Sequence, residues 1–531
     1  MLEEIRTVNH IITMKMNYLK NDLRYLSFLI ITLLTSTGCH KKQASKPNLV
    51  FVLSDQQSWD MLGCYGNKRV ISPNLDKLAS EGIRFNHCIT SSPVCSPYRG
   101  MLLSGQHPLV NGTIHNDIRM LPGEGKYFGE ILRDNGYRTG YYGKWHLYGG
   151  DRVRPVPRGP YRYGFDEEFL TNNCTLDYSK EKSYYWDENN EKQLYGEWEP
   201  DGQTRQAVTF IDNHAGEPFA LFLSWHPPHN WHTPTGWDTT EGYKYGWHKK
   251  GGYKYGAPGE FVNMYDPGSI RLRPNAADND SVRYIYQGHM AMITNLDRNF
   301  GLIIRKLEEK GIADNSIIIF TADHGDLLAS HNWPNNKACP EIESIRVPLI
   351  VKWAGNLKPR VSELLVGTLD LMPTILGLMA LPVPGTCQGI DLSKAIKKGN
   401  DEMVKSVPLF FFPGDWRGIY TRDYTYAFTL DGGSPEPHAI TAGWLNQNVL
   451  YSHKDDPFEL NNLFLNPDYK NVKETLHKKS LQWMKKFRDD SFIFKETIQK
   501  ILGTDDSKAY TGGKPKNFEG ALLGRPIELL K

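Results

Sequence analysis

The sequence predicts an α/β fold in which helices cover both faces of a mostly parallel sheet. Short runs that are apolar on both faces predict buried parallel strands at Leu49–Leu53, Phe219–Ser224, Ile317–Phe320 and Pro348–Val351. Helical patterns lie between them at Pro73–Glu81, Phe128–Asn135, Thr204–His214 and His289–Lys310. Strands that alternate with helices are typical of such a sheet, which binds ligands beyond the carboxyl ends of its strands.

Polar, titratable residues follow four of the predicted strands. Asp55 and Gln56 follow the first, and Lys144 and His146 follow a strand at Thr139–Tyr142. The other two strand ends lead to His226 and His229, and to Asp323 and His324. Because parallel strands end at the same edge of a sheet, these side chains predict one site there.

The composition excludes a protein that binds nucleic acid through its overall charge. The 531 residues include 62 Lys and Arg against 60 Asp and Glu, for a net charge of +2. Any attraction to a polyanion must therefore come from a local cluster. The 28 Tyr, 22 Phe and 13 Trp residues would suit stacking against sugar rings as well as core packing.

The N-terminus carries a processing signal that we assign to residues 1–39. Lys15, Lys20 and Arg24 precede the apolar stretch Tyr25–Leu34, which is too short to span a bilayer. Small residues then lead to Cys39, an arrangement that resembles a bacterial lipobox. We expect cleavage before Cys39 and its acylation, which anchors an exported lipoprotein in the periplasm, outer membrane or cell surface. An ordinary signal peptide is the alternative.

Two further regions mark the organisation of the chain. Gly242–Gly256 repeats Gly-Tyr-Lys-Tyr-Gly and predicts a long loop near the site. The charged stretch Lys394–Lys405 divides a catalytic domain, residues 46–400, from a C-terminal unit, residues 406–531. In that unit, Tyr424–Leu430 predicts part of a small antiparallel sheet, and Val472–Phe487 predicts a terminal helix.

The segment Ser92–Gly105 contains the pattern Cys-x-Pro-x-Arg, in which Cys95 and Arg99 are the end residues. It resembles the signature of the sulfatases, whose cysteine is oxidised enzymatically to formylglycine. Further landmarks that resemble this family extend the likeness over residues 46–465: Pro47–Gln56, Ser72–Ala79, Gly136–His146, Ser224–His229, Asp314–Asp326, Arg346–Val351, Thr368–Leu376 and Asp456–Leu463.

The resemblance implies an alkaline-phosphatase-like α/β/α sandwich with a mostly parallel central sheet and a smaller C-terminal α+β subdomain. It also implies a formylglycine-generating or sulfatase-maturating enzyme as a partner. An aldehyde hydrate suits sulfate hydrolysis because one hydroxyl accepts the sulfuryl group and the other then loses its proton, which expels sulfate. A helix beginning near Pro97 would point backbone N–H groups at the anion.

The resemblance implies a divalent metal held by the formylglycine from Cys95 and by four side chains, Asp55, Gln56, Asp323 and His324. The commonest family pattern looks like Asp-Asp and Asp-Asn, so Gln56 and His324 are departures. Two carboxylates balance a divalent charge. Ca²⁺ prefers oxygen ligands and is the first choice, whereas a nitrogen from His324 would also suit Mn²⁺ or Zn²⁺.

Charge suggests the remaining roles. Lys144 and Lys337 would neutralise the sulfate oxygens, and Arg99 would steady the hydrated aldehyde. His146 is the expected base, and His229 or Lys337 is the expected acid for the departing alkoxide. His226 could instead cap its strand or pack against Trp225, and Lys337 could be a surface lysine.

These residues support hydrolysis of sulfate from a carbohydrate as the leading hypothesis. Gln56 and His324 also resemble those of choline-sulfatase-like and phosphonate-monoester-hydrolase-like relatives, so a phosphonate monoester or phosphodiester hydrolase is the alternative enzyme. An inactive glycan-binding lipoprotein is the alternative of another class. If acylation and catalysis use Cys39 and Cys95, the other five of the seven cysteines permit at most two disulfides.

Overall fold

A computed structural model describes residues 8–10, 12–16, 46–121, 123, 125–149, 152–232, 243–246, 253–331, 336–412, 416–430 and 448–502. Residues 47–531 form one unit, and residues 1–46 form another. Cys39 and most of the predicted signal segment lie outside the described residues. Among the residues described, no helix has the length and apolar character needed to cross a membrane.

The central sheet confirms the predicted fold class. In the described part of the chain it has eleven strands, in the order β12-β2-β13-β11-β1-β7-β3-β4-β5-β6, with β14 paired to β2. Strands β11, β1, β7, β3 and β4 are parallel neighbours. The bounds are β1 Asn48–Asp55, β2 Ile83–Ile89, β3 Arg138–Lys144, β4 Glu168–Asn172, β5 Tyr184–Trp186, β6 Lys192–Leu194, β7 Phe219–Pro228, β11 Ser316–Ala322, β12 Arg346–Val347, β13 Leu349–Lys352 and β14 Arg360–Gly367.

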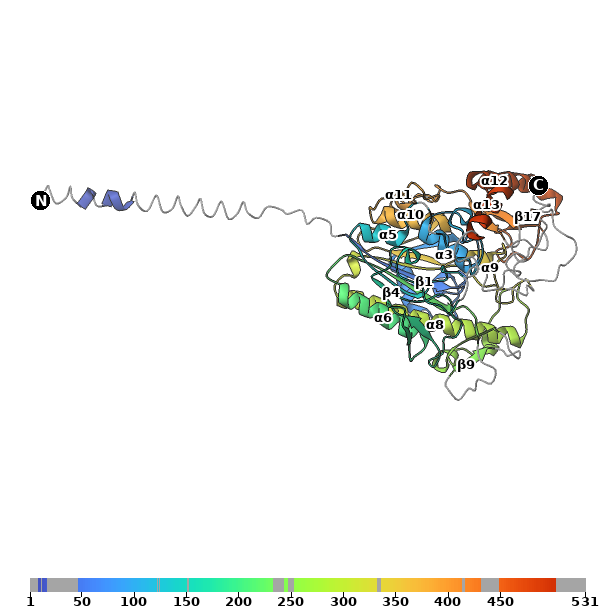
Figure 1. Ribbon diagram of the computed structural model, residues 1–531, viewed down its shortest axis with the longest axis horizontal. Helices are drawn as coiled ribbons and strands as arrows, with labels where there is room; N and C mark the ends of the chain where they lie inside the picture. The colour runs from blue at the N-terminus through green and yellow to red at the C-terminus, as the bar shows by residue number, and fades with distance from the viewer. Residues whose placement is uncertain are drawn as a thin grey trace. The chain divides into compact units, whose positions relative to one another are not determined.

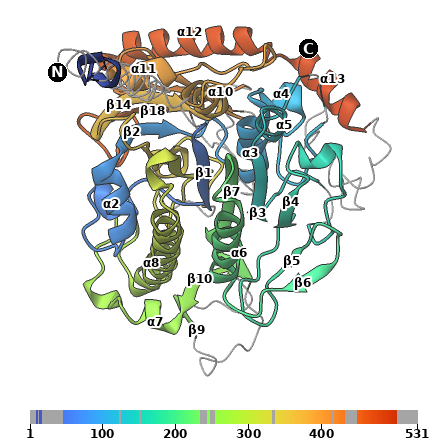
Figure 2. The same ribbon diagram turned by 90° about the vertical axis from the view of Figure 1, so that its left-hand side faces the viewer.

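Helices cover both faces of this sheet (Figures 1 and 2). One face packs against α2 Pro73–Glu81, α6 Glu199–His214 and α8 Asp280–Glu309. The other packs against α3 Cys95–Ser104, α5 Phe128–Asp134, α10 Thr368–Leu378 and α11 Ser393–Lys398. Shorter helices are α4 Pro108–Asn111, α7 Gly259–Val262 and α9 Ile342–Ile345.

Strand β1 shows why its sequence is apolar throughout. Successive side chains on a strand point to opposite faces. Leu49 and Phe51 therefore pack in the cluster that includes α5 and α10, while Val50 and Val52 pack in the cluster that includes α8. With both faces covered, every residue of β1 is buried. The strand ends at Asp55, where polar chemistry begins.

The C-terminal part contains the predicted small antiparallel sheet and terminal helix. Four strands run in the order β15 Val407–Phe411, β16 Trp416–Tyr420, β17 Tyr424–Thr429 and β18 Val449–Ser452. They are followed by α12 Lys470–Phe487 and α13 Ser491–Leu502. Phe411 and Trp416 belong to the same apolar cluster as the central sheet. The predicted boundary near residue 400 falls in the connection between α11 and β15.

Three expectations about individual elements were wrong. The run Pro348–Val351 was expected to be a parallel strand, but β13 runs antiparallel to both β11 and β2, because apolar run length reports burial and not direction. Helix α8 begins at Asp280, before His289, because the Asn279 side chain accepts the Val282 N–H and caps it. The Gly242–Gly256 insertion is not purely a loop, since it contributes β9 Tyr243–Gly246 and the start of β10 Tyr253–Pro258. Strand β10 pairs with β9 on one side and with β8 Trp231–His232 on the other.

No disulfide joins any of the six cysteines that the structure describes. Cys64, Cys88, Cys95, Cys174, Cys339 and Cys387 are all free thiols. The described fold is therefore held by packing, hydrogen bonds and ion pairs, without a covalent link between its segments.

A buried carboxylate on α8 caps the start of α2, and its removal should destabilise the fold. Asp297 accepts the backbone N–H of Leu75 at 2.8 Å and that of Asn74 at 3.2 Å. We expect Asp297→Ala to lower the free energy of unfolding by about 1–3 kcal/mol, since helix N–H groups lose their acceptor. Urea denaturation measures this. Glu308→Ala, at an exposed position of the same helix, is the control, and equal losses in both variants would contradict the capping role.

Candidate active site

The carboxyl ends of four neighbouring strands bring the predicted polar residues to one edge of the sheet. Asp55 ends β1 and Lys144 ends β3, while Asp323 and His324 follow β11, and His229 follows β7. These strands are adjacent and parallel in the order β11-β1-β7-β3. All five side chains are buried. The polar side chains that the sequence placed at this edge therefore lie together in the fold.

Cys95 lies among these side chains and is 1% exposed. Its Sγ lies 3.3 Å from His324 Nε2 and 3.8 Å from Asp55 Oδ1. The ammonium groups of Lys144 and Lys337 each lie 3.5 Å from the same sulfur. A residue modified at position 95 would therefore face two cations and a carboxylate.

Helix α3 positions Cys95 as its first residue, earlier than the predicted start near Pro97. The helix ends at Ser104 and is capped by Gly105, whose φ is +65° and where a Cβ would lie 2.5 Å from Cys387 Sγ. Its N-terminus offers an anion few N–H groups, because Pro97 has none and Ser96 N–H donates to Asn116 Oδ1. Positive charge near Cys95 therefore comes mainly from lysine side chains.

The next turn of α3 places Arg99 between two buried carboxylates. Its guanidinium lies 3.1 Å from Asp55 Oδ2 and 3.1 Å from Asp323 Oδ2. It also donates to the Lys144 carbonyl at 2.9 Å and to Ser224 Oγ at 2.7 Å. Arg99 thus links the ends of four strands, β1, β3, β7 and β11.

The donor atoms near Cys95 fit a metal ion. Asp55, Cys95, Asp323 and His324 offer ligand atoms that all lie within 4.8 Å of one another. His324 Nδ1 lies 3.0 Å from the Gly325 carbonyl and donates to it, so Nε2 is the nitrogen that would bind a cation. Burial lowers the His324 pKa, but Asp323 and Cys95 outweigh burial and raise it, so the cation would replace a proton on Nε2. This set has two carboxylates, which suits a divalent cation.

Gln56 is the fifth predicted ligand and lies beside this set. Its backbone N–H donates to Asp323 Oδ1 at 3.0 Å, and its side-chain amide donates to Asp326 Oδ2 at 2.7 Å. Among the residues described, its buried Oε1 has no hydrogen-bond partner. Because a buried amide oxygen without a partner is unfavourable, this atom also fits a cation ligand.

Electrostatics favour a negative charge at position 95. Burial and Asp55 oppose ionisation of the Cys95 thiol, but Lys144, Lys337 and His324 outweigh them and hold its pKa well below the usual value. Burial likewise opposes ionisation of Asp55, yet Lys144, 2.5 Å away, and its other cationic neighbours lower the Asp55 pKa. Burial and the nearby charge of Asp55 raise the Asp323 pKa.

Lys337 and His229 form a hydrogen-bonded pair next to Cys95. Lys337 Nζ lies 3.0 Å from His229 Nε2, while His229 Nδ1 lies 2.5 Å from the Asn230 carbonyl. His229 therefore donates through Nδ1 and accepts from Lys337 through Nε2. Burial and the charge of Lys337 hold the His229 pKa well below its usual value, so the proton of this pair lies on the lysine. Lys337 is not a surface lysine.

His146 is held by a carboxylate that the sequence did not indicate. Its Nε2 lies 2.9 Å from Asp117 Oδ1. Arg152 donates a hydrogen bond to each Asp117 oxygen, both at 2.7 Å. Burial lowers the His146 pKa, but Cys174 and Asp117 outweigh burial and raise it to about 10. His146 also interacts with the Cys95 side chain and adopts a φ of +57°, a strained conformation common at functional sites.

His226 does not join the group around Cys95 but forms a buried pair with Glu199. Its Nδ1 is 2.5 Å from Glu199 Oε1, and its ring lies against Tyr178 at 5.6 Å between centroids. Both members of the pair are fully buried. His226 is thus anchored by α6 through Glu199, and its neighbour His229 is the histidine that contacts Lys337.

Several residues at the site were missed by sequence reasoning. Asp326, three residues after Asp323, accepts hydrogen bonds from Gln56 and from Tyr255 at the end of the Gly/Tyr insertion. Cys174 follows β4 and interacts with His146. Position after a strand could have identified both, but no spacing links Asp117 or Arg152 to His146.

Comparison with known proteins decides the family. A family model described as Sulfatase matches residues 47–381. The chain belongs to the sulfatase family. This sulfatase is a sulfuric ester hydrolase. The family match and the structural match confirm the resemblance to sulfatases that was seen in the Cys95 segment.

Individual relatives cover most of the chain. An ulvan-active sulfatase of Formosa agariphila is 30% identical over 485 residues, which cover 88% of this chain and 87% of the relative. An endo-4-O-sulfatase of Bacteroides thetaiotaomicron is 27% identical over 543 residues, which cover 89% and 99%. The crystal structure of a Bacteroides fragilis sulfatase has a TM-score of 0.72 and 29% identity, and the match covers 85% of this chain and 98% of that one.

Loss of the Arg99 charge should destabilise this sulfatase strongly. We expect Arg99→Met to lower the free energy of unfolding by about 3–5 kcal/mol, because two buried carboxylates lose their shared cation. Chemical denaturation measures the change. The matched control is Arg133→Met, which removes an exposed arginine paired with Asp134 and should cost less than about 1 kcal/mol. Similar losses in both variants would mean that Arg99 does not organise the strand ends.

Proposed function

We propose that this sulfatase hydrolyses sulfate esters of a sulfated carbohydrate, with a formylglycine made from Cys95 as its nucleophile. The observation that carries the proposal is the position of Cys95, buried among Lys144, Lys337, Asp55 and His324. The carbohydrate class is supported by the names of the relatives, which act on ulvan or are endo-4-O-sulfatases. A hydrated formylglycine would supply the hydroxyl that attacks sulfur.

The residues that would hold the divalent cation are Asp55, Asp323, His324, Gln56 and the modified residue 95. The cation would lower the charge of the sulfate group and of residue 95 when bound. Ca²⁺ is the proposed ion, since most donors of this set are oxygen atoms, although the His324 nitrogen would also suit Mn²⁺ or Zn²⁺. Support comes from the donor cluster and from the partnerless Gln56 Oε1 within the described chain.

Fixed cations would bind the sulfate group. Lys144 and Lys337 approach the Cys95 sulfur from two elements, so sulfate bound at residue 95 would lie between two ammonium groups. Both are in place before substrate arrives, and preorganised charge stabilises a transition state without reorganisation. Arg99 would act through Asp55 and Asp323, since its guanidinium contacts and orients both carboxylates.

Two histidines would take part in proton transfer, His229 together with Lys337 at the leaving group and His146 at residue 95. The Lys337–His229 pair holds a proton that can pass to the oxygen of the departing sugar, which is a poor leaving group. His146 also contacts residue 95, and the Asp117–Arg152 pair fixes its ring. With a raised pKa, His146 would start the cycle protonated and orient residue 95, and it could accept a proton only after giving its own to Asp117 or to solvent.

Export, lipid anchoring at Cys39 and a maturating enzyme are also part of the proposal. Their support is the sequence of residues 1–39 and the Cys95 segment. An exported lipoprotein on the cell surface or in the periplasm would meet polysaccharides directly.

Modification and activity at Cys95 test the proposal together. In the native host, the peptide that contains Cys95 should be about 18 Da lighter than the cysteine form, as thiol is replaced by aldehyde. Mass spectrometry measures this loss. Cys95→Ala should lower turnover of an aryl sulfate roughly a thousandfold or more, whereas Cys64→Ala should leave it unchanged.

Two results would contradict this assignment. An unmodified Cys95 together with no turnover would favour an inactive glycan-binding protein. Faster hydrolysis of an aryl phosphodiester than of an aryl sulfate would favour the phosphodiesterase alternative.

The leaving group should reveal the proton donor. We expect His229→Ala, which breaks the Lys337–His229 pair that holds the proton, to slow desulfation of a sulfated oligosaccharide by about 10²–10⁴-fold. An aryl sulfate should be slowed far less, because a phenolate leaves without a proton. Steady-state kinetics on both substrates measure the difference. His214→Ala, a histidine on α6 paired with Glu168, is the control. Equal losses on the two substrates would assign His229 to binding and not to proton transfer.

A further inference from the structure

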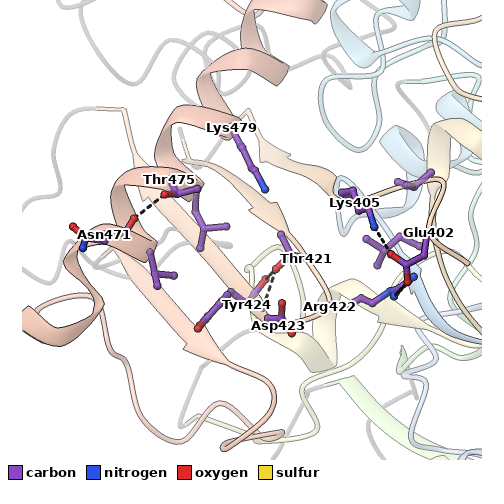
Figure 3. A pocket seen from close by; sticks show the side chains of 13 residues that line it. Glu402, Lys405, Thr421, Arg422, Asp423, Tyr424, Asn471, Thr475 and Lys479 are labelled. Atoms are coloured by element: carbon purple, nitrogen blue, oxygen red, sulfur yellow. Dashed lines mark hydrogen bonds and ion pairs between the residues drawn. The ribbon is translucent and has the colours of Figure 1, made fainter.

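A groove of about 530 Å³ lies in the C-terminal part of the molecule, and it shares no residue with the catalytic site (Figure 3). Helix α12 forms one wall, while residues 402–405 and the turn 421–424 form the other. Its volume lies within the range of small-molecule sites in proteins, which are roughly 300–1,000 Å³.

The helix that forms the first wall is strongly basic. Helix α12 carries six lysines and one glutamate, in a chain whose net charge is +2. Lys473 donates to the Phe464 carbonyl, and Lys486 lies over the Trp483 ring, so these two are engaged elsewhere. Lys479 lines the groove, and in the described structure no carboxylate lies within ion-pair distance of it. Its charge is therefore available to an anion.

The opposite wall is held rigidly and carries two cations and two acids, so the excess positive charge of the groove comes from Lys479. Arg422 donates to the Glu363 carbonyl at 2.9 Å and to Glu402 Oε1 at 2.6 Å. Lys405 pairs with the same Glu402, so two cations share one carboxylate. Asp423 is the other acid of the lining, which leaves three cations against two acids.

The groove also offers the contacts that a sugar ring needs. Leu365, Val404 and Leu476 are buried apolar residues of the lining. On the exposed side of α12, Thr475 Oγ1 donates to the Asn471 carbonyl at 2.8 Å, which leaves its oxygen lone pairs and the Asn471 amide for hydroxyl groups. An apolar base, neutral hydrogen-bonding groups and an ammonium group match the apolar face, hydroxyls and sulfate of a sulfated pyranose.

We propose that this groove is a second binding site for a sulfated oligosaccharide, separate from the site of hydrolysis. The proposal rests on the carbohydrate class proposed above as the substrate. Lys479 binds a sulfate group, and Asn471 and Thr475 bind hydroxyls of the same sugar. Holding a polymer at this groove raises its effective concentration at the catalytic site, whereas small substrates gain nothing.

Binding of defined probes to the full chain tests the groove. In a Cys95→Ala background, which prevents turnover, oligosaccharides of ulvan and of chondroitin sulfate are titrated by calorimetry. Lys479→Glu should weaken binding of the sulfated probe that the protein prefers by about tenfold, the effect of one charge-assisted hydrogen bond. Thr475→Trp should weaken it similarly by filling the groove. Chemically desulfated probes should bind weakly to all variants.

The matched control is Lys478→Glu, which makes the same charge change on α12 outside the groove. If Lys478→Glu and Lys479→Glu weaken binding equally, or if neither does, the groove is not a specific site. Equal affinity for a DNA oligonucleotide would likewise overturn the proposal, since it would show general attraction of polyanions.

Hydrolysis of a small aryl sulfate by the Cys95-containing protein separates the two proposals. Lys479→Glu and Thr475→Trp should leave it unchanged. Absence of aryl sulfate turnover in the protein without substitutions would count against the proposed reaction. Binding of a sulfated probe that depends on Lys479 would still support the groove.

Discussion

Arg99 occupies the position on which the catalytic edge of the sheet depends. Its guanidinium contacts Asp55 and Asp323, the last residue of β1 and the first after β11, and it also binds Ser224 on β7 and the backbone of Lys144 on β3. Two carboxylates at the end of adjacent strands would repel one another in a buried setting. Because one guanidinium contacts both and offsets part of their repulsion, they can remain beside Cys95 as donors to a further cation.

The same edge keeps opposite charges close without letting them cancel completely. Lys144 lies 2.5 Å from Asp55 and 3.5 Å from Cys95 Sγ, so one ammonium group serves both a carboxylate and the residue-95 side chain. Gly143, at φ +95°, makes this approach possible, since a Cβ there would lie 2.1 Å from the Ser224 carbonyl. The lysine is thus positioned by a backbone contact between β3 and β7 as well as by charge.

Much of this arrangement was predictable from sequence, because each buried strand is an apolar run that is followed directly by polar residues. Continuous apolar runs located β1, β7 and β11, and the polar residues just after them are those that meet in space. Direction and long-range pairing were not predictable. Nothing local distinguishes the antiparallel β13 from a parallel strand, and Asp117 reaches His146 from a segment whose sequence shows no periodic pattern. The start of α8 was missed because its Asn279 cap precedes the region of clearest periodicity.

The burial of Cys95 restricts when another enzyme could modify it relative to folding. The sulfur is enclosed by α3, three strand ends and two lysines, and the residue is 1% exposed. Because α3 begins at Cys95 itself and the side chain is enclosed, another enzyme could not reach that sulfur in the folded chain. Any enzymatic change to this side chain must therefore come before the helix forms. If residue 95 is modified as proposed, a chain that folds before it meets the modifying enzyme would keep its cysteine.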